Sequence, residues 1–146
     1  ICVTNGYAHV GPSGSGHYLK MIHNAIEYGM MQAIAEGYEI LKESHFNFDL
    51  SEISKVFKNG SVVRSWLIDL LSEQLQEDPS LEKYSGKVGH SGECQWAIEE
   101  AKEMGIDIQA IKASLDMRLG SQNNPTFGSK TLSAMRYAFG GHKEKS

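Results

Sequence analysis

Cysteine is scarce in this chain, and long apolar runs and excess positive charge are absent. Two cysteines, Cys2 and Cys94, are too few for a disulfide framework and lack metal-ligand spacing, so we expect a reducing, cytoplasmic setting and no metal. No apolar run reaches the length of a membrane span and no signal peptide is visible, which argues against a membrane protein. The net charge of −4 disfavours nucleic acid as a partner but allows a local basic pocket for a small anion.

The 146 residues, 40% of them hydrophobic and 22% charged, are enough for one globular domain with a real core. Glycines and polar turn residues divide the chain into helical stretches, and only residues 84–88 suggest a strand. We therefore expect an all-α domain whose long first helix is its central spine. Predicted helices cover residues 16–43, 49–58 (capped by Asp49 or Ser51), 62–75 (capped by Ser61), 96–104, 108–119 and 127–139.

The predicted first helix carries five polar side chains at helical spacing. With 100° per residue, these side chains fall within about 140° of one face, while apolar residues occupy the other faces. A surface helix normally shows the reverse, an apolar stripe on a polar rod. We therefore expect a helix that is buried on most sides and whose polar stripe lines a cavity. The five residues of this polar stripe are Lys20, His23, Asn24, Glu27 and Tyr28.

Lys20 and Glu27 are candidate acid–base groups. They lie two turns apart, about 10 Å along the axis, which is too far for a direct ion pair but suits two groups that act on different atoms of one small substrate. His23 and Asn24 between them can hold hydroxyl groups. Lysine and glutamate on one helix are also common surface charges, so spacing alone leaves the site hypothesis open.

The stretch from Gly14 to Gly29 closely resembles the signature helix of 6-phosphogluconate dehydrogenases, whose usual wording is G-x-G-H-x-V-K-M-V-H-N-G-I-E-Y-G. Three departures, Leu19, Ile22 and Ala25, are small apolar changes off the polar face. A match of this length is far more specific than a lone glycine motif.

Later segments resemble the same family in the same order. Residues 64–67 and 92–96 look like internal family segments, and Arg118 stands at the spacing of the family's phosphate-binding arginine. Residues 136–142 resemble the family's C-terminal R-x-x-F-G-x-H. The likeness therefore spans nearly the whole chain.

The resemblance implies the all-helical C-terminal domain of a short-form enzyme, built around a long central helix. Residues 1–15 would be the linker from a missing N-terminal Rossmann domain, and residues 16–146 would be the helical catalytic and dimerisation domain. The chain has no G-x-G-x-x-G after a strand, so the cofactor-binding residues would lie mainly on that missing domain.

The implied reaction is the oxidative decarboxylation of 6-phosphogluconate to ribulose 5-phosphate with NAD+ or NADP+, a step of the pentose phosphate pathway. By position, Lys20 would take the proton of the 3-hydroxyl and later return it to the carbonyl oxygen, and Glu27 would protonate the enediol carbon. His23, Asn24 and Tyr28 would hold the hydroxyls, carboxylate and phosphate of the substrate.

Three basic residues complete the implied substrate site. Arg118 would bind phosphate, because a planar guanidinium suits bidentate contact with that group. Arg136 and His142 would reach into the site of a partner subunit, which makes a homodimer part of the implied mechanism.

One departure from the family concerns the phosphate. Long-form enzymes carry K-G-T-G-K-W near the position of Trp96, and the first lysine helps to bind phosphate. This chain has Ser91 and Gln95 in place of the two lysines. The phosphate would lose one cation. Either another residue compensates, with Lys87 and His90 as nearby candidates, or the affinity for phosphate is lower.

Two other functions stay open. A related β-hydroxyacid dehydrogenase acting on a smaller, unphosphorylated acid would share the lysine and the asparagine but would not need the phosphate-binding residues. A non-enzymatic helical dimerisation module would have its pocket packed shut, whereas an enzyme needs Lys20, Asn24 and Glu27 to face an open cleft.

The isolated chain is predicted to be inactive, because the site for its hydride acceptor would lie on the missing domain. The measurement is NAD(P)H absorbance after mixing the chain with 6-phosphogluconate and NAD+ or NADP+. Clear turnover by this chain alone would contradict the prediction.

Overall fold

Six helices and no strand make up the part of the chain that the computed structural model describes, residues 3–144. The prediction of an all-α domain is confirmed. The helices are α1 (Ser15–Glu43), α2 (Leu50–Lys58), α3 (Trp66–Glu77), α4 (Glu93–Glu103), α5 (Gln109–Gly120) and α6 (Phe127–Gly140).

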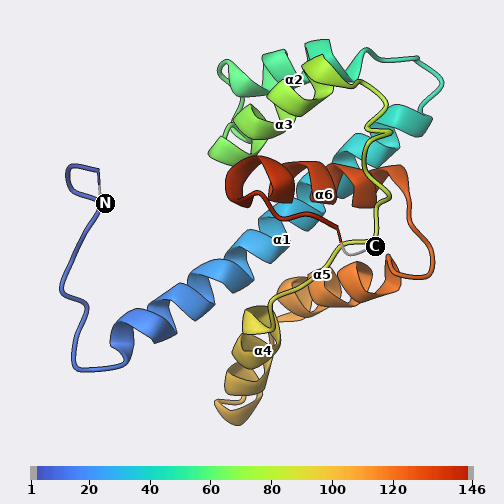
Figure 1. The fold of residues 1–146 in the computed structure, drawn as a ribbon. Coiled ribbons are helices and arrows are strands. Elements are labelled where there is room, and N and C mark those ends of the chain that lie inside the picture. The colour runs from blue at the N-terminus through green and yellow to red at the C-terminus, as the bar shows by residue number, and fades with distance from the viewer. Residues whose placement is uncertain (1–2, 145–146) are drawn as a thin grey trace.

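Helix α1 is the axis around which the other helices are arranged (Figure 1). It contains 29 residues, which makes it about 43 Å long, and it contacts α2, α4, α5 and α6. Helix α6 crosses it, with α2 and α3 on one side of the crossing and α4 and α5 on the other. The first helix is therefore the central spine that its length predicts.

Residues 3–14 precede α1 without forming a helix or a strand, and Figure 1 shows them extending away from the helical body. Their role as an interdomain linker stays a prediction. Residues 1 and 2, and Cys2 with them, lie outside the described part of the chain. None of the helices formed by residues 3–144 combines the length and the apolar character needed to cross a membrane.

The main apolar core lies where α1, α3 and α6 meet, and α2 closes one edge of it. Met31 of α1 and Leu71 of α3 are both 0% exposed. A second, smaller cluster joins Tyr28 of α1 to Cys94 of α4 and Leu115 of α5. Because α1 belongs to both clusters, it holds the two halves of the domain in a fixed relation.

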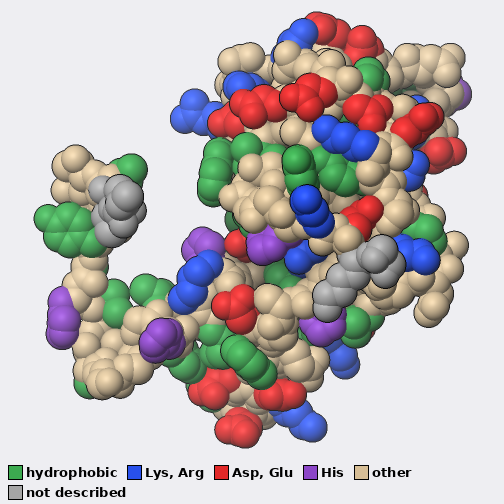
Figure 2. Space-filling model, viewed as in Figure 1, with side chains coloured by type: hydrophobic (Ala, Val, Ile, Leu, Met, Phe, Trp, Pro, Cys, Tyr) green, Lys and Arg blue, Asp and Glu red, His purple; other side chains and the backbone are tan. Residues whose placement is uncertain are grey.

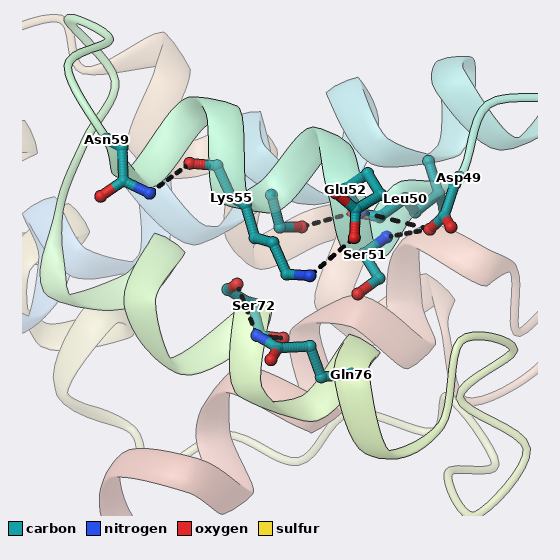
Figure 3. A network of polar contacts seen from close by, with 9 residues as sticks. Asp49, Leu50, Ser51, Glu52, Lys55, Asn59, Ser72 and Gln76 are labelled. Carbon is teal, nitrogen blue, oxygen red and sulfur yellow. Dashed lines mark hydrogen bonds and ion pairs between the residues drawn. The ribbon is translucent and has the colours of Figure 1, made fainter.

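The ends of α2 are set by short-range hydrogen bonds (Figure 3). The Asp49 carboxylate accepts from the backbone N–H groups of Ser51 at 2.9 Å and Glu52 at 3.2 Å, so Asp49 rather than Ser51 is the N-cap. At the other end, the Asn59 side chain donates to the Lys55 carbonyl at 2.9 Å. The helix predicted over this stretch is confirmed.

Helix α3 begins later than its sequence pattern predicts. The Ser61 hydroxyl accepts from the Val63 N–H at 3.1 Å in a local turn, and the intervening Val62 is 100% exposed. Ser65 is the actual cap, because its Oγ accepts from the N–H of Ile68 at 3.3 Å. The predicted start after Ser61 is therefore wrong, because this serine caps a turn rather than a helix.

Residues 84–88, the one stretch whose pattern suggested a strand, form no strand. The Val88 N–H donates to Ser121 Oγ at 3.0 Å, and the Val88 carbonyl accepts from the Gln122 side chain at 2.8 Å. Side chains that follow α5 thus satisfy the backbone groups that a neighbouring strand would otherwise pair.

The N-terminal half of α1 is not buried on most sides, contrary to the expectation from its pattern. Leu19 and Ile26 are 54% and 53% exposed, and Met30 is 45% exposed. They line an open depression of about 440 Å³, which we call the apolar groove. The helix carries the predicted inverted polarity, but the described part of the chain leaves this apolar side uncovered. The other apolar residues of the groove are Ile22, Trp66, Leu67 and Phe139.

Truncation of a core side chain tests this account of the fold. Leu71→Ala should lower the free energy of unfolding by about 2–5 kcal/mol, because it leaves a cavity in the main core. Leu19→Ala, the same truncation in the apolar groove, should lower it by less than about 1 kcal/mol. Urea unfolding followed by circular dichroism measures both losses, and equal values would contradict the placement of the core.

Candidate active site

One cavity of about 150 Å³ lies between α1, the start of α4, α5 and the end of α6. In the space-filling view, acidic, basic and histidine side chains gather in the middle of the visible face, between α6 and α4 (Figure 2). Of the predicted site residues, only His23 lies outside the lining, at the rim, where it faces the apolar groove. The predicted residues that line the cavity are Lys20, Asn24, Glu27, Tyr28, Arg118, Arg136 and His142.

The polar stripe of α1 is internally hydrogen-bonded. The Lys20 ammonium donates to Asn24 Oδ1, and His23 Nδ1 lies 3.0 Å from the same oxygen. Glu27 Oε2 lies 4.0 Å from His23 Nδ1. Asn24 is only 9% exposed, so its amide is a fixed acceptor that orients the Lys20 ammonium while Lys20 itself stays exposed.

Arg118 is a deeply buried charge at the cavity wall, with 2% of the residue exposed. Its guanidinium carbon lies 3.5 Å from the centroid of the Tyr28 ring, a cation–π contact between α5 and α1. Its Nη2 lies 3.9 Å from the Met31 sulfur, and its Nε has no hydrogen-bond partner. Burial lowers the pKa of Arg118 to about 10, so the group stays charged at neutral pH. A buried guanidinium with an unused donor suits an anion.

Arg136 adds a second guanidinium to the same wall. Burial lowers the pKa of Arg136, and the nearby Tyr28 and Glu27 oppose that shift. Arg136 also lowers the pKa of Arg118 by charge repulsion. Within residues 3–144, neither arginine has an ion-pair partner. The lining therefore holds the cationic side chains of Lys20, Arg118 and Arg136 against the two carboxylates of Glu27 and Glu93, and this excess of positive charge favours an anionic ligand.

His142 reaches the cavity because the chain reverses at the end of α6. Gly141 adopts the left-handed conformation, with a φ of 62°, and ends the helix. The His142 ring then folds back over Gly140, where an added Cβ would lie 2.5 Å from ring atoms. The ring lies 5.8 Å from that of Phe139. Both glycines are therefore needed for this position of the imidazole.

Two further cavity residues, Ser91 and Glu93, precede and begin α4. The Ser91 N–H donates to Tyr28 Oη at 3.4 Å, and its hydroxyl donates to the Glu93 carboxylate at 2.9 Å. Sequence reasoning missed Glu93 because α4 begins three residues earlier than predicted. The described lining includes neither Lys87 nor His90, so the structure does not support the expectation that one of them replaces the long-form lysine.

The arrangement can bind a small hydroxylated molecule with an anionic end. Lys20 and Glu27 offer an ammonium and a carboxylate for proton transfer, and the α5–α6 wall offers two guanidinium groups. Asn24 and Tyr28 provide hydrogen-bonding groups between them. Residues 3–144 bring together no group of three histidine, cysteine or acidic side chains that could hold a metal ion.

The likeness of the chain to known proteins covers nearly all of it. A family model described as "6-phosphogluconate dehydrogenase, C-terminal domain" matches residues 16–140. The Bacillus subtilis protein named "Putative 6-phosphogluconate dehydrogenase YqeC" is 46% identical over 140 residues, covering 96% of this chain and 47% of that protein. A Haloferax volcanii protein named "6-phosphogluconate dehydrogenase, NAD(+)-dependent, decarboxylating" is 39% identical over 140 residues, and the match covers 95% of this chain and 47% of the Haloferax protein.

A more distant relative gives the same family name. The Lactococcus lactis subsp. cremoris protein named "6-phosphogluconate dehydrogenase, decarboxylating" is 34% identical over 148 residues, and the match covers 94% of this chain and 31% of the Lactococcus protein. The chain thus spans about half the length of the first two relatives and about a third of this one.

Inorganic phosphate is a direct probe of the positive cavity. Phosphate at about five times its Kd should raise the Tm of the chain by about 3 °C, because it binds the folded state only and so adds about 1 kcal/mol to the free energy of unfolding. Arg118→Met should remove this rise without unfolding the chain, since an apolar side chain of similar length replaces a buried, unpaired charge. Lys112→Met, an exposed change on the same helix, should keep it. Differential scanning fluorimetry measures all three, and an undiminished rise in Arg118→Met would place the anion elsewhere.

Proposed function

The chain belongs to the 6-phosphogluconate dehydrogenase family, and on that premise we propose that it carries the substrate site of an enzyme that converts 6-phosphogluconate to ribulose 5-phosphate and CO2. The observation that carries this proposal is one open cavity that joins Lys20 and Glu27 to Arg118 and Arg136. A dimerisation module without catalysis would have this cavity packed shut.

The chemistry begins with the oxidation of the 3-hydroxyl of the substrate. Lys20, in its neutral form, takes the hydroxyl proton as the hydride leaves the same carbon. NAD+ or NADP+, when bound, accepts this hydride. Asn24 holds the Lys20 ammonium by a hydrogen bond, so the base keeps its direction as its charge changes.

Loss of CO2 and reprotonation complete the reaction. Lys20 returns its proton to the new carbonyl oxygen while the carboxylate leaves as CO2, which gives an enediol. Glu27 then protonates the carbon that carried the carboxylate, and Lys20 removes the enediol proton so that the ketone of ribulose 5-phosphate forms. Because Glu27 lies two turns from Lys20 on α1, each group addresses its own atom of the sugar acid.

The phosphate of the substrate would bind at the α5–α6 wall. Arg118 and Arg136 supply two guanidinium groups without ion-pair partners among the described residues, and His142 adds an imidazole. Asn24 in the cavity lining and His23 beside it would hold hydroxyl groups of the substrate. The two arginines favour a phosphorylated substrate over the smaller, unphosphorylated acid of a related β-hydroxyacid dehydrogenase.

The dinucleotide would be bound mainly by a segment outside this chain. The sequence offers no G-x-G-x-x-G after a strand, and the first two relatives are about twice as long as the matched region. The Haloferax volcanii relative is named as NAD(+)-dependent, and the choice between NAD+ and NADP+ belongs to the dinucleotide-binding segment.

A homodimer is part of the proposal. Arg136 and His142 line the cavity of their own chain, and their reach into a partner's site stays a prediction. The uncovered apolar groove beside the cavity supports association, because an apolar surface of this kind gains free energy when it is covered.

Lys20→Met in the full-length protein is the direct test. The variant should lose at least about a thousandfold in kcat for 6-phosphogluconate, because no other group takes the hydroxyl proton. Its Kd for 6-phosphogluconate, measured by isothermal titration calorimetry, should stay within about threefold, because the phosphate contacts remain. Lys42→Met, on the same helix but away from the cavity, is the matched control and should keep full activity.

Two outcomes would overturn the proposal. Normal turnover by Lys20→Met would remove Lys20 from its role as the base. A higher kcat/KM of the wild type for gluconate than for 6-phosphogluconate would favour the β-hydroxyacid dehydrogenase alternative.

A further inference from the structure

A single carboxylate near the C-terminus joins three segments of the chain. Glu144 accepts hydrogen bonds from the backbone N–H of Ser85 at 2.7 Å and of Gly86 at 2.8 Å, both in the loop between α3 and α4. It also accepts from the Ser133 hydroxyl of α6 at 2.6 Å. Figure 1 shows residues 141–144, the C-terminal tail, running back along α6 toward this loop. The tail is therefore fastened at its end.

The Glu144 contacts are of the strong, charge-assisted kind. Burial by itself raises the pKa of Glu144, but hydrogen bonds from Ser133, Ser85 and Gly86 outweigh it and hold the pKa below its usual value. The carboxylate is therefore ionised at neutral pH, and all three bonds form to a charged acceptor.

The fastened loop is closely packed at the same point. Gly86 has a φ of +81°, and an added Cβ would lie 2.7 Å from Ser129 Oγ of α6. A side chain at this position would push the loop away from α6 and move the Gly86 N–H from the Glu144 carboxylate. Loop, tail and α6 thus fit together only around a glycine.

Each of the three joined segments carries a residue of the cavity lining. His142 lies two residues before Glu144 in the tail, and Ser91 follows Gly86 in the loop. Arg136 lies on α6 about one turn beyond Ser133. Release of Glu144 would therefore loosen two sides of the substrate site at once, while Lys20 and Glu27 on α1 would stay in place.

We propose, building on the function proposed above, that Glu144 is a positioning residue of the substrate site: it touches no substrate but holds His142 and the Ser91 loop in their binding positions. Nothing in the reaction itself requires this carboxylate. Its loss should therefore weaken substrate binding and leave the proton transfers largely intact.

Substitutions of Glu144 and Ser133 in the full-length protein test the proposal. Glu144→Ala should raise KM for 6-phosphogluconate about tenfold, as expected if the tail is docked about one-tenth of the time, and should change kcat by less than about twofold. Ser133→Ala removes one of the three donors and should raise KM about twofold to threefold. The KM of Glu144→Gln should lie between the values of Ser133→Ala and Glu144→Ala, because the NH2 group of glutamine faces an N–H donor to which the carboxylate offered an acceptor. Lys143→Ala, an exposed change in the tail, should match the wild type.

Hydrogen–deuterium exchange supplies a readout independent of turnover. In Glu144→Ala, peptides covering residues 84–92 and 136–144 should exchange faster, and peptides of α1 should not. Unchanged exchange in the two peptides, or unchanged KM despite faster exchange, would overturn the proposal. If Glu144→Ala does not fold by circular dichroism, Ser133→Ala carries the same comparison.

The failure of the proposed function would have a different signature. If the full-length wild type does not turn over 6-phosphogluconate, the proposed reaction is refuted. The proposed role of the Glu144 contacts is not refuted by that result, as long as hydrogen–deuterium exchange differs between wild type and Glu144→Ala as expected. The role of the Glu144 contacts would then be tested by hydrogen–deuterium exchange and by the Kd for inorganic phosphate. This Kd should rise in Glu144→Ala and not in Lys143→Ala. An unchanged Kd for phosphate in Glu144→Ala would overturn it.

Discussion

The candidate site depends on the burial of one positive charge between two helices. Arg118 of α5 stacks on Tyr28 of α1 and is withdrawn almost completely from water. Such a contact is worth about 2 kcal/mol when desolvated, whereas removing a charge from water costs several kcal/mol. The Arg118 Nε remains without a partner. The fold therefore keeps a partly compensated charge at the cavity, and a ligand that satisfied this charge would also stabilise this half of the domain.

The site combines groups of different rigidity. Lys20, Asn24 and Glu27 come from the interior of a long helix, whose backbone is fixed by its own hydrogen bonds. His142 comes from the C-terminal tail, whose position depends on two glycines and on the Glu144 contacts. In the proposed reaction, proton transfer would need the stiffer set, because small displacements at a reacting centre cost much rate. Binding of the phosphate would tolerate the softer set.

Much of this arrangement could be predicted from the sequence, because its signals are local. Helical spacing alone placed the polar stripe on one face of α1, and the all-α class followed from the absence of strand patterns. The predicted start of α3 was wrong because Ser61 and Ser65 offer equivalent capping chemistry, and only tertiary packing selects Ser65. The exposed side of α1 could not be foreseen. An apolar pattern predicts that a surface is covered, but it does not indicate which part of the protein covers it. The contacts of Glu144 were likewise hidden, because two of its three partners lie 58 and 59 residues away along the chain.

The double membership of α1 in both apolar clusters restricts how this sequence can evolve. Its polar stripe ends near Tyr28 and its main-core residues begin at Met31. One residue inserted or deleted between them would rotate the two halves of the helix by about 100° relative to each other. The core half would then hold the domain together while the polar stripe faced away from α5 and α6. Side chains along this helix can therefore be exchanged one at a time, but its length between these two points is constrained far more strongly than its composition.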